Sequence, residues 1–157
     1  MNRQKRTEEL LVAFSNIKVD NLQLLLIGSL SPDIEPIIKK YVQADQRVKY
    51  LGWKSSEELE DYLCAGDLYI QPGSQSVLMQ IAICSGCAVA IFPHKSHKHL
   101  LQDRAFYIDS VQEIENTLLQ ISSNRNTLDE KRKESFEFAK SRLDYKKLAS
   151  YIYERID

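Results

Sequence analysis

The residues best suited to chemistry lie in a short turn between a predicted strand and a predicted helix. The strand covers Asp67–Gln71, the turn covers Pro72–Ser76, and an apolar helix continues to Ser85. A turn of glycine and hydroxyl residues that leads into a helix N-terminus presents free backbone N–H groups at a positive dipole end, which suits phosphate. The same residue types also serve any strand-to-helix turn of an α/β protein. The turn alone leaves both an anion site and a plain connection open.

Charge and cysteine content restrict the class of protein. The 157 residues carry 21 Lys and Arg against 22 Asp and Glu, so no general field attracts nucleic acid. Cys64, Cys84 and Cys87 are odd in number and lack the paired spacing of a zinc site, which indicates reduced thiols. No apolar run reaches the roughly 20 residues of a membrane-spanning helix, and the polar start is unlike a signal peptide. We expect a cytoplasmic location and leave a peripheral association with the inner membrane face open.

Helical and extended periodicities alternate along the first two thirds of the chain, and short connections separate them. This alternation predicts one Rossmann-like α/β domain over residues 1–157, with a parallel sheet and helices on both faces. The predicted strands are Leu22–Ile27, Arg47–Leu51, Asp67–Gln71, Ala88–Phe92 and Ala105–Ile108. The predicted helices between them are Thr7–Ile17, a helix opened by Ser31 and Pro32, a helix capped by Ser55 or Ser56, Ser76–Ser85 and Ser96–Leu101. Helices over Val111–Ile121, Leu128–Ser141 and Tyr145–Ile156, with a polar break at Ser122–Thr127, are expected to pack alongside.

Six groups of residues, taken in order, resemble the C-terminal half of GT-B fold glycosyltransferases, in particular the "glycosyl transferases group 1" class. Together they span nearly the whole chain. They are Lys5, Arg6, Glu9, Leu10, Leu11, Ala13 and Phe14; Leu24–Gly28; Val48, Tyr50, Leu51, Gly52 and Trp53 followed by Glu57–Leu59 and Tyr62; Ala65–Leu68 with Pro72; Cys84, Ser85, Gly86, Ala88 and Val89; and Asp144, Tyr145, Leu148, Ala149 and Tyr151.

The resemblance implies a domain that binds a nucleotide-diphosphate sugar. The sugar would pass to an acceptor such as a polysaccharide or a lipid-linked glycan, without a metal and without a cofactor besides the donor. The base would lie beside Gly52, Trp53 and Lys54, and the diphosphate beside Gly73–Ser76 with Lys5 as the cation. The nucleotide-binding set we expect is Lys5, Arg6, Gly28, Ser29, Gly52, Trp53, Gly73, Ser74, Gln75, Ser76 and Gln80. No catalytic residue can be assigned from spacing.

Two departures from the family pattern point to a second hypothesis. Ile81 stands where the family usually has a glutamate that binds the donor ribose, and an apolar side chain cannot accept that hydrogen bond. Gln80 could replace it only in a different helix register. The family's first strand and the acceptor domain would lie before Met1, so transfer by these residues alone is not expected. The alternative is a non-catalytic partner or scaffold domain, whose open sheet edge or apolar groove another chain, or a second copy in a homodimer, could cover.

Two further features carry alternatives. His94, His97 and His99, with Lys95 and Lys98, form a basic cluster after a predicted strand end. We favour, in decreasing order, a solvated loop, a phosphate or acceptor contact, and a metal site. The metal site comes last because neither Cys nor carboxylate stands nearby. Trp53 suits either stacking on a base or packing at the strand end.

Overall fold

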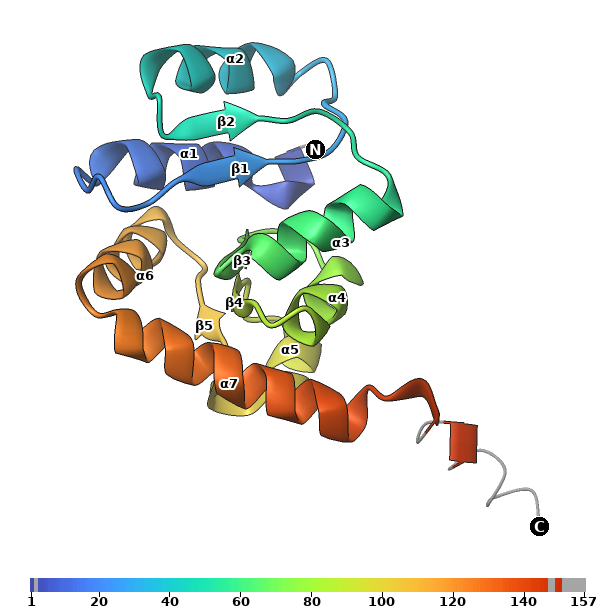
Figure 1. Cartoon of the computed structure of the whole chain (residues 1–157). Coiled ribbons are helices and arrows are strands. Elements are labelled where there is room, and N and C mark those ends of the chain that lie inside the picture. Colours follow the sequence, from blue (N-terminus) through green and yellow to red (C-terminus); the bar gives the residue numbers. More distant parts are fainter. Residues whose placement is uncertain (2, 147–148, 151–157) are drawn as a thin grey trace.

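Parallel strands flanked by helices make up the computed structural model, which describes residues 1, 3–146 and 149–150 (Figure 1). The Rossmann-like α/β prediction is therefore confirmed. The strands are β1 (Leu24–Leu26), β2 (Val48–Tyr50), β3 (Leu68–Gln71), β4 (Ala88–Ile91) and β5 (Phe106–Tyr107). The helices are α1 (Thr7–Asn16), α2 (Glu35–Ala44), α3 (Ser56–Ala65), α4 (Leu78–Cys84), α5 (Lys95–Leu101), α6 (Val111–Ser123) and α7 (Arg125–Arg142), with short 3₁₀ turns η1 (Arg3–Lys5) and η2 (Gln102–Arg104).

The strands form two separate parallel ladders. β1 pairs with β2, with Leu24 opposite Val48. β3, β4 and β5 form the second ladder in that order, with Leu68 opposite Ala88. Within the described residues β1 and β3 share no ladder, although Figure 1 shows the two ladders one above the other. One edge of β1 and one edge of β3 are therefore unpaired.

The core consists of two apolar clusters, one on each side of β4. Ala88 and Ala90 belong to the cluster that includes α1, β1 and α6, whereas Val89 and Ile91 belong to the cluster with α4 and α5. Successive side chains of a strand point to opposite faces, which explains why every residue of β4 is buried. Helices thus cover both faces of this ladder, as predicted.

Helix starts depart from the sequence predictions at two places. The predicted start of α2 at Ser31 and Pro32 is wrong, because the Ser31 carbonyl accepts the N–H groups of Ile34 and Glu35 (both 3.1 Å) and closes a turn first. Helix α4 begins at Leu78 and not at Ser76, because the Ser76 hydroxyl accepts the Leu78 N–H at 3.2 Å. At α3, by contrast, Ser55 is the cap, and it forms a reciprocal capping box with Glu58.

The C-terminal helices are more continuous than predicted. The expected break at Ser122–Thr127 is wrong, because α6 runs to Ser123 and α7 starts at Arg125, with Asn124 alone between them. Most of the helix predicted over Tyr145–Ile156 lies outside the described residues. No helix in the described part of the chain combines the length and hydropathy needed to cross a bilayer.

Candidate functional site

Two basic side chains near the N-terminus point at the turn that follows β3. The Arg6 guanidinium lies 3.4 Å from the Pro72 carbonyl oxygen, and its Nε donates to Glu9 at 3.1 Å. The Lys5 ammonium lies 3.5 Å from the carbonyl oxygens of Ser74 and Gln75, a long contact for a hydrogen bond. Arg6 precedes α1 with a left-handed backbone (φ 53°), so the chain bends sharply here. Positive charge therefore gathers at the carboxyl end of β3.

The turn itself is fastened to the N-terminal segment through its backbone. The Ser74 N–H donates to the Gln4 carbonyl at 2.8 Å. Gly73 is packed so closely that a Cβ there would overlap Gln4 and the Lys5 backbone, which requires glycine. Gln75 and Ser76 follow, and in the part of the chain that the structure describes their N–H groups have no hydrogen-bond partner. These two amides are available to meet an anion.

Side chains that the sequence analysis did not select brace the same turn. Gln71 donates from its side-chain amide to the Ser74 carbonyl and accepts from the Tyr69 hydroxyl. Burial raises the pKa of Tyr69 to about 12, so its hydroxyl stays protonated as a donor at neutral pH. The sequence offered little indication of this role for Gln71 and Tyr69, because alternate positions along a strand such as β3 are equally compatible with simple packing.

A second pair of glycines connects the ends of β1 and β2. The Gly28 N–H donates to the Gly52 carbonyl at 2.8 Å, and the Tyr50 hydroxyl donates to the Gly28 carbonyl at 3.0 Å. Both glycines have positive φ, 125° and 74°, which favours glycine over other residues. Ser29 follows Gly28, and its backbone carbonyl accepts a hydrogen bond from the N-terminal amino group of Met1. The N-terminal segment therefore contacts the carboxyl ends of both ladders.

Trp53 projects into solvent beyond β2 and is 70% exposed. The packing alternative for this residue is thereby excluded, and a flat apolar ring stands free. Next to it, the Lys54 ammonium lies 5.8 Å from the centre of the Tyr62 ring and 3.2 Å from Glu58. Trp53 is thus a strongly exposed aromatic side chain just beyond the carboxyl end of β2, where Tyr50 is 36% exposed.

Five of the eleven predicted binding residues line one or both of two hollows. The larger cavity, about 670 Å³, extends between β1 and β3, and Lys5, Gly28 and Ser76 line it at the carboxyl ends of the strands. The smaller one, about 350 Å³, lies between α4 and α5 and is lined by Gln75, Ser76 and Gln80 among others. Ser76 borders both. Arg6, Ser29, Gly52, Trp53, Gly73 and Ser74 line neither hollow.

The side chains of Gln80 and Ile81 have different surroundings on α4. Gln80 is exposed and borders the smaller hollow, whereas Ile81 is partly buried against the apolar cluster around Met79 and Ile83. Ile81 lines neither hollow. Ile81 therefore packs against the core at this position.

The histidine cluster is part of the packed structure at the start of α5. His97 is buried and its Nδ1 lies 2.9 Å from the Phe92 carbonyl oxygen, while the His94 ring packs against both neighbours, with ring centres 4.7 Å from Phe92 and 5.1 Å from His97. His99 and Lys98 are exposed. Among the described residues no group of three or more His, Cys, Asp or Glu side chains is arranged to hold a metal ion.

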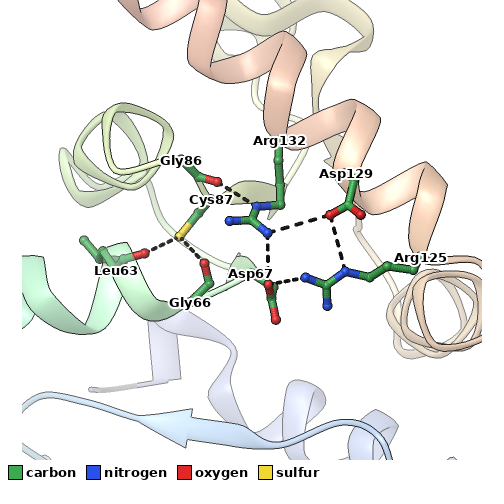
Figure 2. A network of polar contacts seen from close by, with 8 residues as sticks. All are labelled: Leu63, Gly66, Asp67, Gly86, Cys87, Arg125, Asp129 and Arg132. Carbon is green, nitrogen blue, oxygen red and sulfur yellow. Dashed lines mark hydrogen bonds and ion pairs between the residues drawn. The ribbon is translucent and has the colours of Figure 1, made fainter.

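A polar network at the opposite, amino ends of the strands was not predicted (Figure 2). Asp67, directly before β3, pairs with Arg125 at 2.5 Å and with Arg132 at 3.1 Å. Arg132 also donates to the Gly86 carbonyl at 2.9 Å, and Cys87 contributes its thiol to the Leu63 carbonyl at 2.9 Å. The two arginines are 58 and 65 residues from Asp67 in sequence, so no local pattern indicated the contact. The network joins α7 to β3 and lies away from the candidate site.

Comparison with solved structures identifies the fold. Neither a family model nor a curated protein matches the sequence. Among solved structures, Anabaena Alr3699/HepE in complex with UDP-glucose superimposes with a TM-score of 0.83 at 15% identity, over 99% of this chain and 46% of that one. Sucrose-phosphate synthase from Thermosynechococcus elongatus gives 0.80 at 18% identity, over 99% and 43%.

A third structure narrows the likeness to one domain. The C-terminal domain of the group 1 family glycosyltransferase LpcC from Francisella tularensis gives a TM-score of 0.78 at 16% identity, over 91% of this chain and 82% of that domain. The chain has the fold of the C-terminal, Rossmann-like domain of GT-B glycosyltransferases. It spans less than half the length of HepE and of the sucrose-phosphate synthase.

Proposed function

We propose that this chain is the nucleotide-sugar-binding half of a glycosyltransferase. The observation that carries the proposal is the meeting of Lys5 and Arg6 with the turn after β3, beside the free N–H groups of Gln75 and Ser76. A nucleotide diphosphate carries negative charge, which cationic side chains and backbone N–H groups bind well. The carboxyl ends of parallel strands are where open α/β sheets bind such ligands.

Trp53 gives the base a surface on which to stack. Its ring is exposed at the end of β2, next to Gly52. The HepE structures in complex with UDP and with UDP-glucose support a nucleotide diphosphate as the ligand class on this fold. The sugar, the base and the acceptor are left open, and transfer needs a second domain that closes over the donor.

Fluorescence of the single tryptophan tests donor binding directly. Trp53 is the one tryptophan of the 157 residues, so its emission reports on the proposed base site without interference. Titration with UDP or GDP up to millimolar concentration is expected to quench it saturably. A flat titration with both nucleotides, together with no heat in calorimetry, would contradict the proposal.

Lys5→Ala tests the diphosphate contact. Removing one charge-assisted contact of about 1.5–3 kcal/mol should weaken binding by roughly 10- to 100-fold. Lys40→Ala, which changes an exposed lysine on α2, is the matched control and should bind as the parent does. Equal affinity of the two variants would exclude Lys5 from the site.

Two observations favour the second hypothesis, a partner or scaffold domain without donor binding. Ile81 packs where the family has its ribose-binding glutamate, and the Ser74 N–H is already donated to Gln4. This hypothesis predicts the flat titration described above, in a chain whose thermal unfolding is nevertheless cooperative. The same experiment therefore separates the two functions.

A further inference from the structure

The smaller hollow, between α4 and α5, contains polar groups that the proposed nucleotide contacts do not use. It has a volume of about 350 Å³, and side chains of α4, of α5 and of the turn before α4 line it. Of the described residues that line it, none is Asp, Glu, Lys or Arg. A charged ligand would lose water here without gaining an ion pair, which is costly. The hollow therefore favours an uncharged ligand.

His97 presents a hydrogen-bond acceptor to this hollow. The residue lines the hollow and is only 6% exposed. Its Nδ1 lies 2.9 Å from the Phe92 carbonyl oxygen, and because a carbonyl only accepts, Nδ1 carries the ring hydrogen. In the neutral ring Nε2 is then an acceptor, and in the described part of the chain it has no hydrogen-bond partner. An acceptor on a side chain this deeply buried calls for a ligand that donates.

Gln75 and Ser96 add a second acceptor and a donor. The Gln75 side-chain amide donates to the Ser96 hydroxyl, which ties the turn after β3 to α5. Among the described residues, the Gln75 side-chain oxygen and the Ser96 hydroxyl hydrogen have no partner of their own. The hollow thus offers two acceptors and one hydroxyl donor. A ligand with several hydroxyl groups satisfies all three, because a hydroxyl both donates and accepts.

Apolar side chains complete the lining. Met79 is buried, Leu100 is partly buried against the second core cluster, and Val77 is exposed. Binding sites for small molecules commonly combine apolar walls with a few well-placed polar groups. A pyranose ring has C–H groups on its faces and hydroxyl groups around its edge. Its faces therefore match the apolar side chains, and its edge matches His97, Gln75 and Ser96.

We propose that the hollow between α4 and α5 binds one uncharged pyranose ring, with one hydroxyl donating to His97 Nε2 and another accepting from Ser96. The ring belongs either to the nucleotide-sugar donor or to an acceptor glycan. Both sources fit, because Ser76 borders this hollow and also the larger cavity that Lys5 lines. The inference rests on the proposed function for the source of the ring, whereas binding of a free hexoside does not require the nucleotide.

The test uses the whole chain and free methyl hexosides. The α-D-glucoside, the α-D-galactoside and the α-D-mannoside are the neutral probes, titrated to tens of millimolar while the backbone amides are followed by NMR. Methyl α-D-glucuronide, which has the same ring with a carboxylate, is the charged counterpart. At least one neutral hexoside is expected to shift the amides of Ser96 and His97 saturably. The glucuronide should bind at least about tenfold more weakly than that hexoside.

Two variants test the contacts. Ser96→Ala removes the donor and should weaken hexoside binding about fivefold. His97→Asn keeps an amide donor for the Phe92 carbonyl but lacks the Nε2 position, and it should weaken binding by a similar factor. Ser123→Ala, which removes an exposed hydroxyl from α6, is the matched control and should bind as the parent does. The affinity for UDP should be the same in all four chains.

Competition identifies the source of the ring. The UDP derivative of the hexose that binds displaces the free hexoside if the ring is the donor's, and leaves it bound if the ring is the acceptor's. The absence of a saturable shift with all three neutral hexosides would overturn the proposal, as would equal affinity of parent, Ser96→Ala and His97→Asn. Hexoside binding in a chain that binds no nucleotide would contradict the proposed function alone, whereas nucleotide binding without hexoside binding would contradict this inference alone.

Discussion

The backbone N–H of Ser74 donates to the carbonyl oxygen of Gln4 across 2.8 Å, and this bond fastens the N-terminal segment to the turn after β3. The turn lies at the carboxyl end of β3, where a nucleotide diphosphate is proposed to bind. The same segment carries Lys5 and Arg6. The placement of the two cations thus depends on how closely residues 4 and 5 approach the turn.

Gly73→Ala is expected to break that approach. A methyl group at Gly73 would overlap Gln4 and the backbone of Lys5, so the N-terminal segment must move. We expect a loss of about 1–3 kcal/mol in the free energy of unfolding, measured by urea denaturation, and a parallel loss of nucleotide affinity. Lys40→Ala, an exposed change on α2 outside the site, serves as the control. A stable Gly73→Ala chain with unchanged affinity would show that the close packing is unimportant.

The two arginines that hold Asp67 should differ in their effect on stability. Arg132 is less exposed than Arg125 (31% against 55% for the side chains) and also donates to the Gly86 carbonyl. Arg132→Met is therefore expected to cost about 1–2 kcal/mol, because a partly buried carbonyl loses its donor. Arg125→Met should cost no more than about 0.5 kcal/mol, as is usual for exposed pairs. Chemical denaturation of both variants checks the order, which the reverse ranking would refute.

Asp45 should make part of the stability dependent on pH. The Arg47 guanidinium donates to the Asp45 carboxylate at 2.6 Å and holds the pKa of that carboxyl below its ordinary value of 3.8. A lowered folded-state pKa contributes stability that is present above about pH 4 and is lost as the pH falls through the folded value.

Asp45→Asn removes this contribution at every pH. We expect it to destabilise the chain by about 1–2 kcal/mol at pH 7 and by less at pH 3. Glu60→Gln, an exposed carboxylate on α3, should change neither value. Unfolding free energies of the parent chain and of Asp45→Asn are measured at both pH values. A difference between them that grows on acidification would contradict the prediction.

The three cysteines should react with alkylating reagents in a fixed order. Cys87 is buried, donates to the Leu63 carbonyl, and has its pKa raised to about 11 by that burial. Cys64 and Cys84 are exposed. At pH 8, iodoacetamide followed by mass spectrometry should modify Cys64 and Cys84 in the native chain and Cys87 only after denaturation. Early modification of Cys87 would indicate that the α3–β4 packing opens readily.

Local patterns were sufficient for the order of elements. Apolar runs such as Leu24–Leu26 and Ala88–Ile91 form strands, and the Ser55 capping box starts α3 where the sequence indicated. These features depend on neighbours within a few residues, so a single sequence contains the needed information. The predicted helix starts at Ser31 and Ser76 were wrong. The Ser31 carbonyl and the Ser76 hydroxyl each accept hydrogen bonds in a turn that precedes the helix.

The sequence by itself determined the alternation of helices and parallel strands, the glycines at Gly28, Gly52 and Gly73, and the basic residues Lys5 and Arg6. Only the tertiary structure decided that Arg6 reaches Pro72, that Trp53 is free in solvent, and that Asp67 binds two arginines from α7. It alone decided the cavity between β1 and β3. The physical reason is that these relationships join residues far apart in the chain, and the packing of the whole core sets their distances.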